Sequence, residues 1–466
     1  MHMLRLLTTA AFALLVGCTP LALRENTHAI PAHGVIGIGE AQLTPQFWIA
    51  RQAHVDRVIL DAAAIAAQNA RLIERDPSMH DLRRLPVLLQ RAQVAHWIDG
   101  LSEQPSEPLF GIDGQPVAAA TLDALTANLA LAAIPAQTPA RYGLVVRRAA
   151  LRTFPTRLRV FNTRGDTDID RFQESALFPG TPVVIAHASR DGEWLFVVSP
   201  RYAAWIEKRM VAEGTAAQVF GYVDKTPYRI ITGATAQTVF TREQPEVSQL
   251  QLDMGVRVPL LIDGPADKAV NGQHPYTSHV IELPMRANDG SLRFAPALLQ
   301  RNADSVDDYL PLSAANVISQ AFKFLGERYG WGDSYDGRDC SGFVSVVYRS
   351  MGIEMPRNTS AQAVSPAFNH RAFTDTDSLD ARIAAARALE VGDLVYIPGH
   401  VMMVIGQLDG APYVIHDTSG LTYRKPDGSL ARIKLNEVSV SPLLPLLFND
   451  TQSYVERMTS IVRMRP

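Results

Sequence analysis

The sequence predicts an α+β protein in which a helical N-terminal segment and two small β-rich blocks precede an α+β domain at residues 306–466. Three observations support this prediction. Apolar residues in the first hundred or so positions recur at the three-and-four spacing of an amphipathic helix. Short strands separated by turns then fill residues 116–305, and helices followed by a run of strands fill the remainder.

The bulk composition is that of a folded globular protein. The chain has 466 residues, of which 47% are hydrophobic and 20% charged, and its net charge is −3. This length is sufficient for roughly three or four domains. Because the chain carries no excess of positive charge, nucleic acid is not expected as a partner.

Residues 1–18 have the form of an export signal. Arg5 precedes an apolar stretch from Leu6 to Val16 that is too short to span a bilayer. Leu15-Val16-Gly17-Cys18 resembles the lipobox of bacterial lipoproteins, in which the cysteine is acylated and becomes the mature N-terminus. An ordinary cleaved signal and a buried N-terminal helix remain alternatives. With Cys18 acylated, we expect a lipid anchor on the periplasmic side of a bacterial membrane, and Thr19 in place of aspartate favours the outer membrane.

Residues 19–115 are predicted to form a helical region that packs on the rest of the chain. Its helical spacing is carried by Val55, Val58, Ile59, Ala62, Ile65, Ala66, Leu72 and Ile73. We expect the helical pattern to continue through Leu88, Leu89, Trp97 and Ile98.

Two β-rich domains are predicted next, at residues 116–220 and 221–305. In the first, Asp191-Gly192 is a strong hairpin signal between strands at residues 181–186 and 194–198. In the second, strands are expected at residues 256–262 and 279–283, with a turn at Asn288-Asp289-Gly290. Blocks of this size suit small β-barrels, and a β-sandwich remains an alternative.

The C-terminal domain is expected to begin with two helices. Ser313 is a plausible N-cap for the first helix, which the glycines at 330 and 332 would end. The second helix starts around Cys340, and its apolar residues through Met351 share one stripe. Strands are expected at residues 394–397, 401–405 and 413–415.

Cys340 calls for a chemical explanation. If Cys18 is acylated, Cys340 is the one remaining thiol, and it cannot form an internal disulfide. A free thiol has a pKa of about 8.5, and a helix N-terminus with a neighbouring imidazolium can lower it to roughly 3.5–7.5. We therefore expect a reactive thiolate, although a lone cysteine before an apolar helix is also a common packing residue.

Two downstream histidines favour the chemical interpretation. His400 follows a turn at the start of a predicted strand, where its ring can reach a thiol on a neighbouring helix. His416 lies one strand later, where it can hold the first imidazole in one tautomer. The histidines lack metal-ligand spacing, so no metal is expected, and no cofactor is expected either.

The segments around these residues resemble the NlpC/P60 cysteine peptidases. The motifs are Asp339-Cys340-Ser341-Gly342-Phe343, residues 356–362, Gly392-Asp393-Leu394, residues 400–406, and Ile415-His416. The match covers residues 320–425, and the two β-blocks resemble the bacterial SH3-like domains found beside cell-wall hydrolases. The resemblance implies a papain-like catalytic domain with Cys340, His400 and His416 as its triad.

The same resemblance implies a substrate. The architecture is similar to the γ-D-glutamyl–L-diamino acid endopeptidases that trim peptidoglycan stem peptides, with preference for a free N-terminal L-Ala. By this resemblance Asp339 and Ser341 would hold the free amine, Tyr329 and Trp331 would line the pocket, and Tyr202 would add a wall from the first SH3-like domain. The loop at residues 332–338 is longer than the usual two-glycine link.

Other interpretations remain open at this stage. A broader wall amidase or an acyltransferase on the same fold would use the same thiol. A wall-binding lipoprotein with a decayed peptidase domain is the alternative outside enzymes, although intact Cys340, His400 and His416 count against it.

Overall fold

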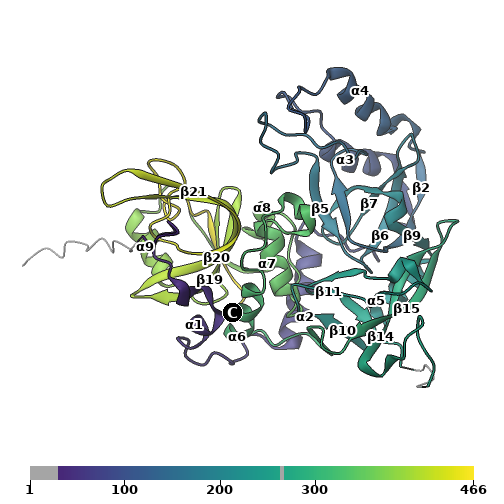
Figure 1. Cartoon of the computed structure of the whole chain (residues 1–466). Coiled ribbons are helices and arrows are strands. Elements are labelled where there is room, and N and C mark those ends of the chain that lie inside the picture. The colour runs from purple at the N-terminus through teal and green to yellow at the C-terminus, as the bar shows by residue number, and fades with distance from the viewer. Residues whose placement is uncertain (1–29, 263–266, 466) are drawn as a thin grey trace, which may run out of the picture.

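A computed structural model describes residues 30–465 except for 263–266. The predicted signal and Cys18 therefore lie outside the described residues. Figure 1 shows a C-terminal α+β part, coloured green to yellow, beside two β-rich parts coloured blue to teal. Within the described ranges, no helix combines the length and apolar character needed to cross a membrane.

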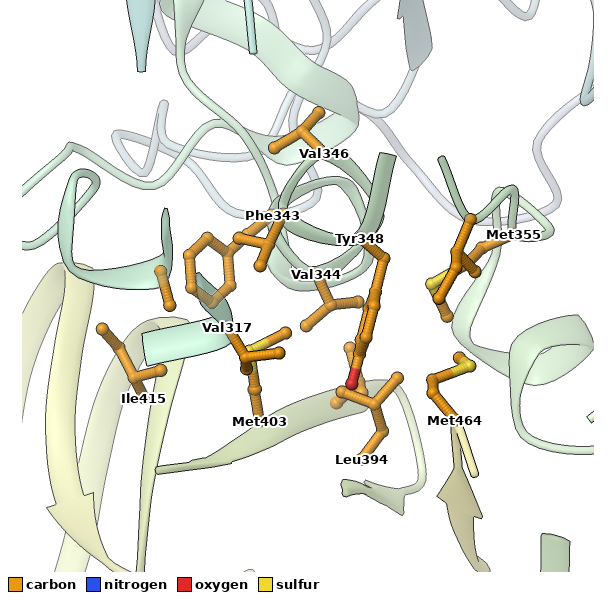
Figure 2. Packing of buried hydrophobic residues seen from close by; sticks show 14 of the residues in the cluster. Val317, Phe343, Val344, Val346, Tyr348, Met355, Leu394, Met403, Ile415 and Met464 are labelled. Carbon is orange, nitrogen blue, oxygen red and sulfur yellow. The ribbon is translucent and has the colours of Figure 1, made fainter. Parts of the chain in front are cut away.

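The C-terminal part is built on a six-stranded antiparallel sheet in the order β17-β22-β18-β19-β20-β21. These strands are Asn369–Ala372, Ser460–Arg463, Leu394–Ile397, His400–Leu408, Ala411–Arg424 and Leu430–Pro442. The helices of this part are α6 (Ala314–Phe322), α7 (Cys340–Arg349), α8 (Thr359–Gln362) and α9 (Leu379–Arg387). Figure 2 shows the core, in which Phe343, Val344 and Tyr348 of α7 pack against Leu394, Met403 and Ile415 of the sheet.

Side-chain caps position the two helices. The Ser313 hydroxyl accepts from the Asn316 N–H and caps α6, as predicted. The Asp339 carboxylate accepts from the Gly342 N–H at 2.8 Å and caps α7, whose start at Cys340 was also predicted. Helix α6 ends at Phe322, earlier than the predicted end at the glycines, because residues 323–329 turn away toward β21.

The N-terminal arm, residues 30–60, packs on the C-terminal part. It contains α1 (Pro45–Ile49), whose Trp48 is fully buried. The Trp48 ring lies 5.2 Å from the Tyr413 ring. A Cβ at Gly406 would lie only 2.9 Å from Trp48, so the glycine at this position in the sheet leaves room for the arm. Helix α2 (Ala62–Arg75) follows, and its Asn69 amide donates to the Gly352 carbonyl at 2.7 Å.

The next helices cover the first β-rich part. They are α3 (Arg91–Leu101) and α4 (Ala119–Asn128), and α4 lies beyond the predicted boundary at residue 115. The expected helix through Leu88 and Leu89 is wrong, because Leu88–Gln90 forms strand β1 and pairs with β2 (Gln137–Pro139). This tertiary pairing overrides the local helical spacing.

The first β-rich part is a seven-stranded sheet in the order β5-β4-β8-β7-β6-β3-β9. The strands are Gln173–Leu177, Ala149–Arg152, Ala203–Glu207, Trp194–Val198, Pro182–Ala188, Arg141–Val145 and Val211–Gly214. The predicted Asp191-Gly192 turn joins β6 to β7. Strand β5 lies at one edge, from which it reaches the C-terminal part.

The second β-rich part follows α5 (Ala216–Asp224) and consists of short sheets around one apolar cluster. Its strands are β10 (Tyr228–Ile231), β11 (Thr235–Gln237), β12 (Gln251–Asp253), β13 (Arg257–Pro259), β14 (Ser278–Arg286), β15 (Leu292–Gln300) and β16 (Ser305–Val306). The predicted turn at residues 288–290 lies between β14 and β15. The predicted strand over 256–262 is shorter, because only Arg257–Pro259 pairs with β10.

Candidate active site

Cys340 is the first residue of α7, and its side chain is 6% exposed. The backbone N–H of Val401, at the start of β19, donates a hydrogen bond to its sulfur. The thiol therefore lies against the start of β19, the strand that His400 begins. The N–H of Cys340 itself belongs to the first turn of α7, which has no intrahelical acceptor for it, so this group can hold a developing oxyanion.

The two predicted histidines are hydrogen-bonded to one another. His400 Nε2 lies 2.7 Å from His416 Nδ1, and His416 Nε2 lies 3.0 Å from the Ser441 hydroxyl oxygen. If Nε2–H of each ring donates along this series, the Nδ1 of His400 is left unprotonated. This nitrogen is then free to accept a hydrogen bond or a proton.

Burial keeps this cluster uncharged. It lowers the pKa of His400 to about 4 and places the pKa of His416 well below its ordinary value. Burial, followed by the charge of Asp339, raises the pKa of Cys340 to about 12. The expectation of a lowered thiol pKa is therefore wrong for the free protein, because desolvation of the thiolate outweighs the helix N-terminus and the neutral imidazoles supply no positive charge.

Asp417 is a buried carboxyl group next to His416 that no motif had singled out. Neither of its oxygens has a hydrogen-bond partner among the residues that the structure describes, and the side chain is fully buried. Burial, together with the charges of Asp339 and Glu327, raises the pKa of Asp417 well above its usual range. Burial therefore favours the protonated, neutral form of this group.

Asp339, the predicted amine ligand, is already fully engaged. Besides capping α7, its carboxylate accepts from Arg357 Nη2 at 2.7 Å, from the Ser341 hydroxyl at 3.0 Å and from the Gly332 N–H at 3.0 Å. Arg357 also donates to the Ser341 hydroxyl at 2.8 Å. A substrate ammonium would have to share oxygens that these donors occupy.

The same arginine joins the C-terminal part to the first β-rich part. Arg357 Nε donates to the Ser175 hydroxyl of β5 at 2.6 Å, and Arg357 Nη2 lies 3.3 Å from the Asp333 carboxylate. Burial would raise the pKa of Asp333, but the charges of Arg357 and Arg148 outweigh it and lower that pKa. A Cβ at Gly342 would lie 2.2 Å from Asp333 Oδ1, so the motif glycine makes room for this carboxylate.

The pocket aromatics also meet the first β-rich part. Trp331 Nε1 donates to the Gln173 carbonyl at 3.0 Å. Tyr329 is buried, and it lies close enough to Cys340 that a thiolate there would raise the pKa of the tyrosine. The longer loop forms a 3-10 turn over Trp331–Asp336, in which Asp333, Tyr335 and Asp336 have φ of 57–61°. It lies against the first β-rich part, where the Tyr335 hydroxyl donates to the Thr167 carbonyl at 3.0 Å.

Tyr202, the predicted wall residue, bonds two polar groups. Its hydroxyl donates to Glu174 of β5, and it is also hydrogen-bonded to Asn358, the residue after Arg357. The site also contains residues to which the sequence analysis assigned no role, among them Arg357, Glu174 and Asp417. Arg357 lies in a quoted motif, which was an available signal, whereas Glu174 and Asp417 carry no local pattern.

Comparison with known proteins agrees with this geometry. Residues 326–439 match the model of the NlpC/P60 family, and residues 159–207 match that of an SH3 domain of the SH3b1 type. The chain is 27% identical over 210 residues to the γ-D-glutamyl-L-lysine dipeptidyl-peptidase of Bacillus cereus, which covers 42% of this chain and 56% of that one. It is also 44% identical over 50 residues, 10% of each chain, to a probable endopeptidase p60 of Listeria seeligeri. The chain thus spans just over half of the Bacillus relative.

A solved structure shares the fold over most of the chain. It is an NlpC/P60 endopeptidase from Photobacterium damselae subsp. piscicida, which matches with a TM-score of 0.70 and 16% identity. The match covers 89% of this chain and 96% of that one. The chain therefore carries a cysteine-peptidase domain of the NlpC/P60 family at residues 326–439, preceded by an SH3 domain of the SH3b1 type at residues 159–207.

Proposed function

We propose that this protein is an endopeptidase of peptidoglycan stem peptides that cleaves the amide between γ-D-Glu and the L-diamino acid. The observation that carries this proposal is the hydrogen-bonded series His400, His416 and Ser441 in the same buried cluster as Cys340. The Bacillus cereus relative is a γ-D-glutamyl-L-lysine dipeptidyl-peptidase, and this supports the choice of amide.

In the proposed mechanism the thiol is activated only as it reacts. Cys340 Sγ attacks the carbonyl carbon while His400 Nδ1 takes the thiol proton, so no resting thiolate is required. The Cys340 N–H stabilises the oxyanion. His400 then protonates the leaving amine, and a thioester remains until water, deprotonated by the same ring, releases the acid. His416 orients His400 through the 2.7 Å hydrogen bond.

We propose further that the enzyme prefers a free N-terminal L-Ala. Asp339 is committed to Arg357, so its part in this selectivity is to fix Ser341 and the start of α7. Glu174, whose two oxygens accept from the Tyr202 and Thr153 hydroxyls, is the carboxylate that we assign to the substrate ammonium, because unlike Asp339 it pairs with no cation in the described part of the chain. A matched pair of variants separates this assignment: Glu174→Gln should lose the preference for the free amine, and Glu193→Gln, on the exposed β6–β7 turn, should retain it.

Defined muropeptides test the proposed function. We expect L-Ala-γ-D-Glu-diamino acid peptides to release L-Ala-γ-D-Glu, as measured by mass spectrometry. N-acetylated copies and intact sacculi should react more slowly, because acylation removes the ammonium charge that the partly exposed Glu174 carboxylate would attract. Release of a different fragment would contradict the bond assignment, and equal rates for free and acetylated peptides would contradict the amine pocket. Cys340→Ala is the control for contaminating hydrolases.

For localisation we propose a lipid anchor at Cys18, facing the periplasm. The support is the Leu15-Val16-Gly17-Cys18 segment alone. Cys18→Ser should move the protein from the membrane to the soluble fraction. Membrane association unchanged by this substitution, with no lipid mass on the mature N-terminus, would contradict the proposal.

A further inference from the structure

A cavity of about 250 Å³ lies where α2 and all three larger parts of the chain meet. Ile73 near the end of α2 and Val256 of the second β-rich part line it. The first β-rich part contributes Phe178 and Arg201, and the C-terminal part contributes Arg349 and Glu354. Cys340, His400 and His416 are not among its lining residues, so the cavity is separate from the candidate active site.

Arg201 carries an uncompensated charge in this wall. Its guanidinium makes no hydrogen bond or ion pair with any residue that the structure describes, and its Nη1 is buried without a partner. Burial and the charge of Arg349 outweigh the opposing charge of Glu354 and lower the pKa of Arg201 to about 9, which leaves it protonated at neutral pH. By contrast, the buried Arg152, Arg338 and Arg357 all form ion pairs with carboxylates.

Arg349 adds a second positive group to the same cavity. Its guanidinium lies 5.6 Å from the centre of the Phe178 ring and forms no ion pair in the described part of the chain. Glu354 lines the cavity as well but lies beyond ion-pair distance of both arginines. Arg257, the remaining cation of the lining, donates to the carbonyls of Val223 at 2.6 Å and Lys225 at 2.5 Å. Two guanidinium groups are therefore left without an anion.

We propose that this cavity binds a small carboxylate with a short apolar body, held by Arg201 and Arg349. An arginine fork matches the two oxygens of a carboxylate. Ile73, Phe178 and Val256 provide an apolar wall that suits a hydrocarbon chain better than inorganic phosphate, which is hydrated on all sides. Because the cavity joins α2 to all three larger parts, the bound anion stabilises their assembly.

Thermal unfolding of the whole protein tests the site with butyrate as the probe. At constant ionic strength, replacing chloride by saturating butyrate should raise the Tm by about 2 °C or more, because a ligand of the folded state alone stabilises it. Arg201→Met should lose this shift and, without butyrate, unfold at an equal or higher temperature than the wild type, because it removes a charge that has no ion-pair partner among the described residues. The control Arg84→Met, at an arginine whose side chain is 81% exposed, should keep the shift.

Three results would overturn the proposal. They are no butyrate shift in the wild-type protein, an equal shift in Arg201→Met, and a phosphate shift as large as the butyrate shift. If Arg201→Met does not fold, Arg349→Gln takes its place, and calorimetric titration should then show at least tenfold weaker butyrate binding than for the wild type.

Discussion

Two polar clusters flank the N-terminus of α7, and they are opposite in character. On one side Cys340, His400, His416 and Asp417 are uncharged, and their hydrogen-bonding capacity is only partly used. On the other side Asp339 and Arg357 are ionised and bonded on nearly every polar atom. This difference fits two roles. Groups that exchange protons keep unused hydrogen-bonding capacity, whereas groups that hold geometry use nearly all of theirs.

The largest expected effect lies in the uncharged cluster. Cys340→Ala should lower kcat by about 10⁴-fold or more, because the covalent intermediate cannot form. His400→Ala should do nearly the same, because the thiol then has no proton acceptor. Stopped assays with stem peptides measure both rates, and circular dichroism checks the fold. Substantial turnover by Cys340→Ala would rule out the thiol as the nucleophile.

Substitutions in the cluster of Asp339 and Arg357 should lower the free energy of unfolding. Arg357→Met leaves Asp339 and Asp333 buried without their cation, which costs roughly 3–5 kcal/mol of unfolding free energy. Urea unfolding measures this loss. The double variant Arg357→Met with Asp339→Asn should recover part of it, because the carboxylate charge is gone. A single variant as stable as the wild type would contradict the pairing.

His416 should have an intermediate effect that distinguishes orientation from chemistry. His416→Asn should lower kcat by roughly 10- to 100-fold, or about 1.4–2.8 kcal/mol, because an amide can still accept from His400. Ser441→Ala should cost less, since it only supports His416 at 3.0 Å. If His416→Asn were more damaging than His400→Ala, the roles of the two rings would be reversed.

The smallest effect sharpens the contrast through pH. His416 is neutral in the folded state but titrates near 6.5 when unfolded, so acid favours unfolding. As pH falls below about 6.5, the wild type should lose about 1.4 kcal/mol per pH unit relative to His416→Asn. Relative to Asp417→Asn, the wild type should instead gain stability as the pH falls, because protonation of Asp417 favours the folded state. Parallel stability curves for all three proteins would contradict buried neutral groups.

Local patterns predicted the placement of the reactive residues. The start of α7 at Cys340 follows from a capping residue before an apolar stripe, and His400 begins a strand after a glycine turn, as expected. The strand pairing of Leu88 could not be predicted in this way, because its partner Pro139 is distant in sequence and the local spacing favoured a helix.

The electrostatics of the site depended on long-range contacts. Ser175 and Arg357 are 182 positions apart, and no periodicity connects them. The pKa of Cys340 illustrates the same limit. The helix N-terminus is visible in the sequence, whereas the burial that outweighs it comes from β19 and β20 folding over α7.

The N-terminal arm joins an early segment of the sequence to the C-terminal sheet. The Tyr413 hydroxyl donates to the Gly37 carbonyl at 3.1 Å, across 376 positions of chain. Because the arm is made long before β20, Trp48 can pack against the Tyr413 ring only after that strand has been synthesised. The C-terminal part can therefore complete its packing only after β20 has been made, and this order would keep Cys340 from being fixed in place in a partly made chain.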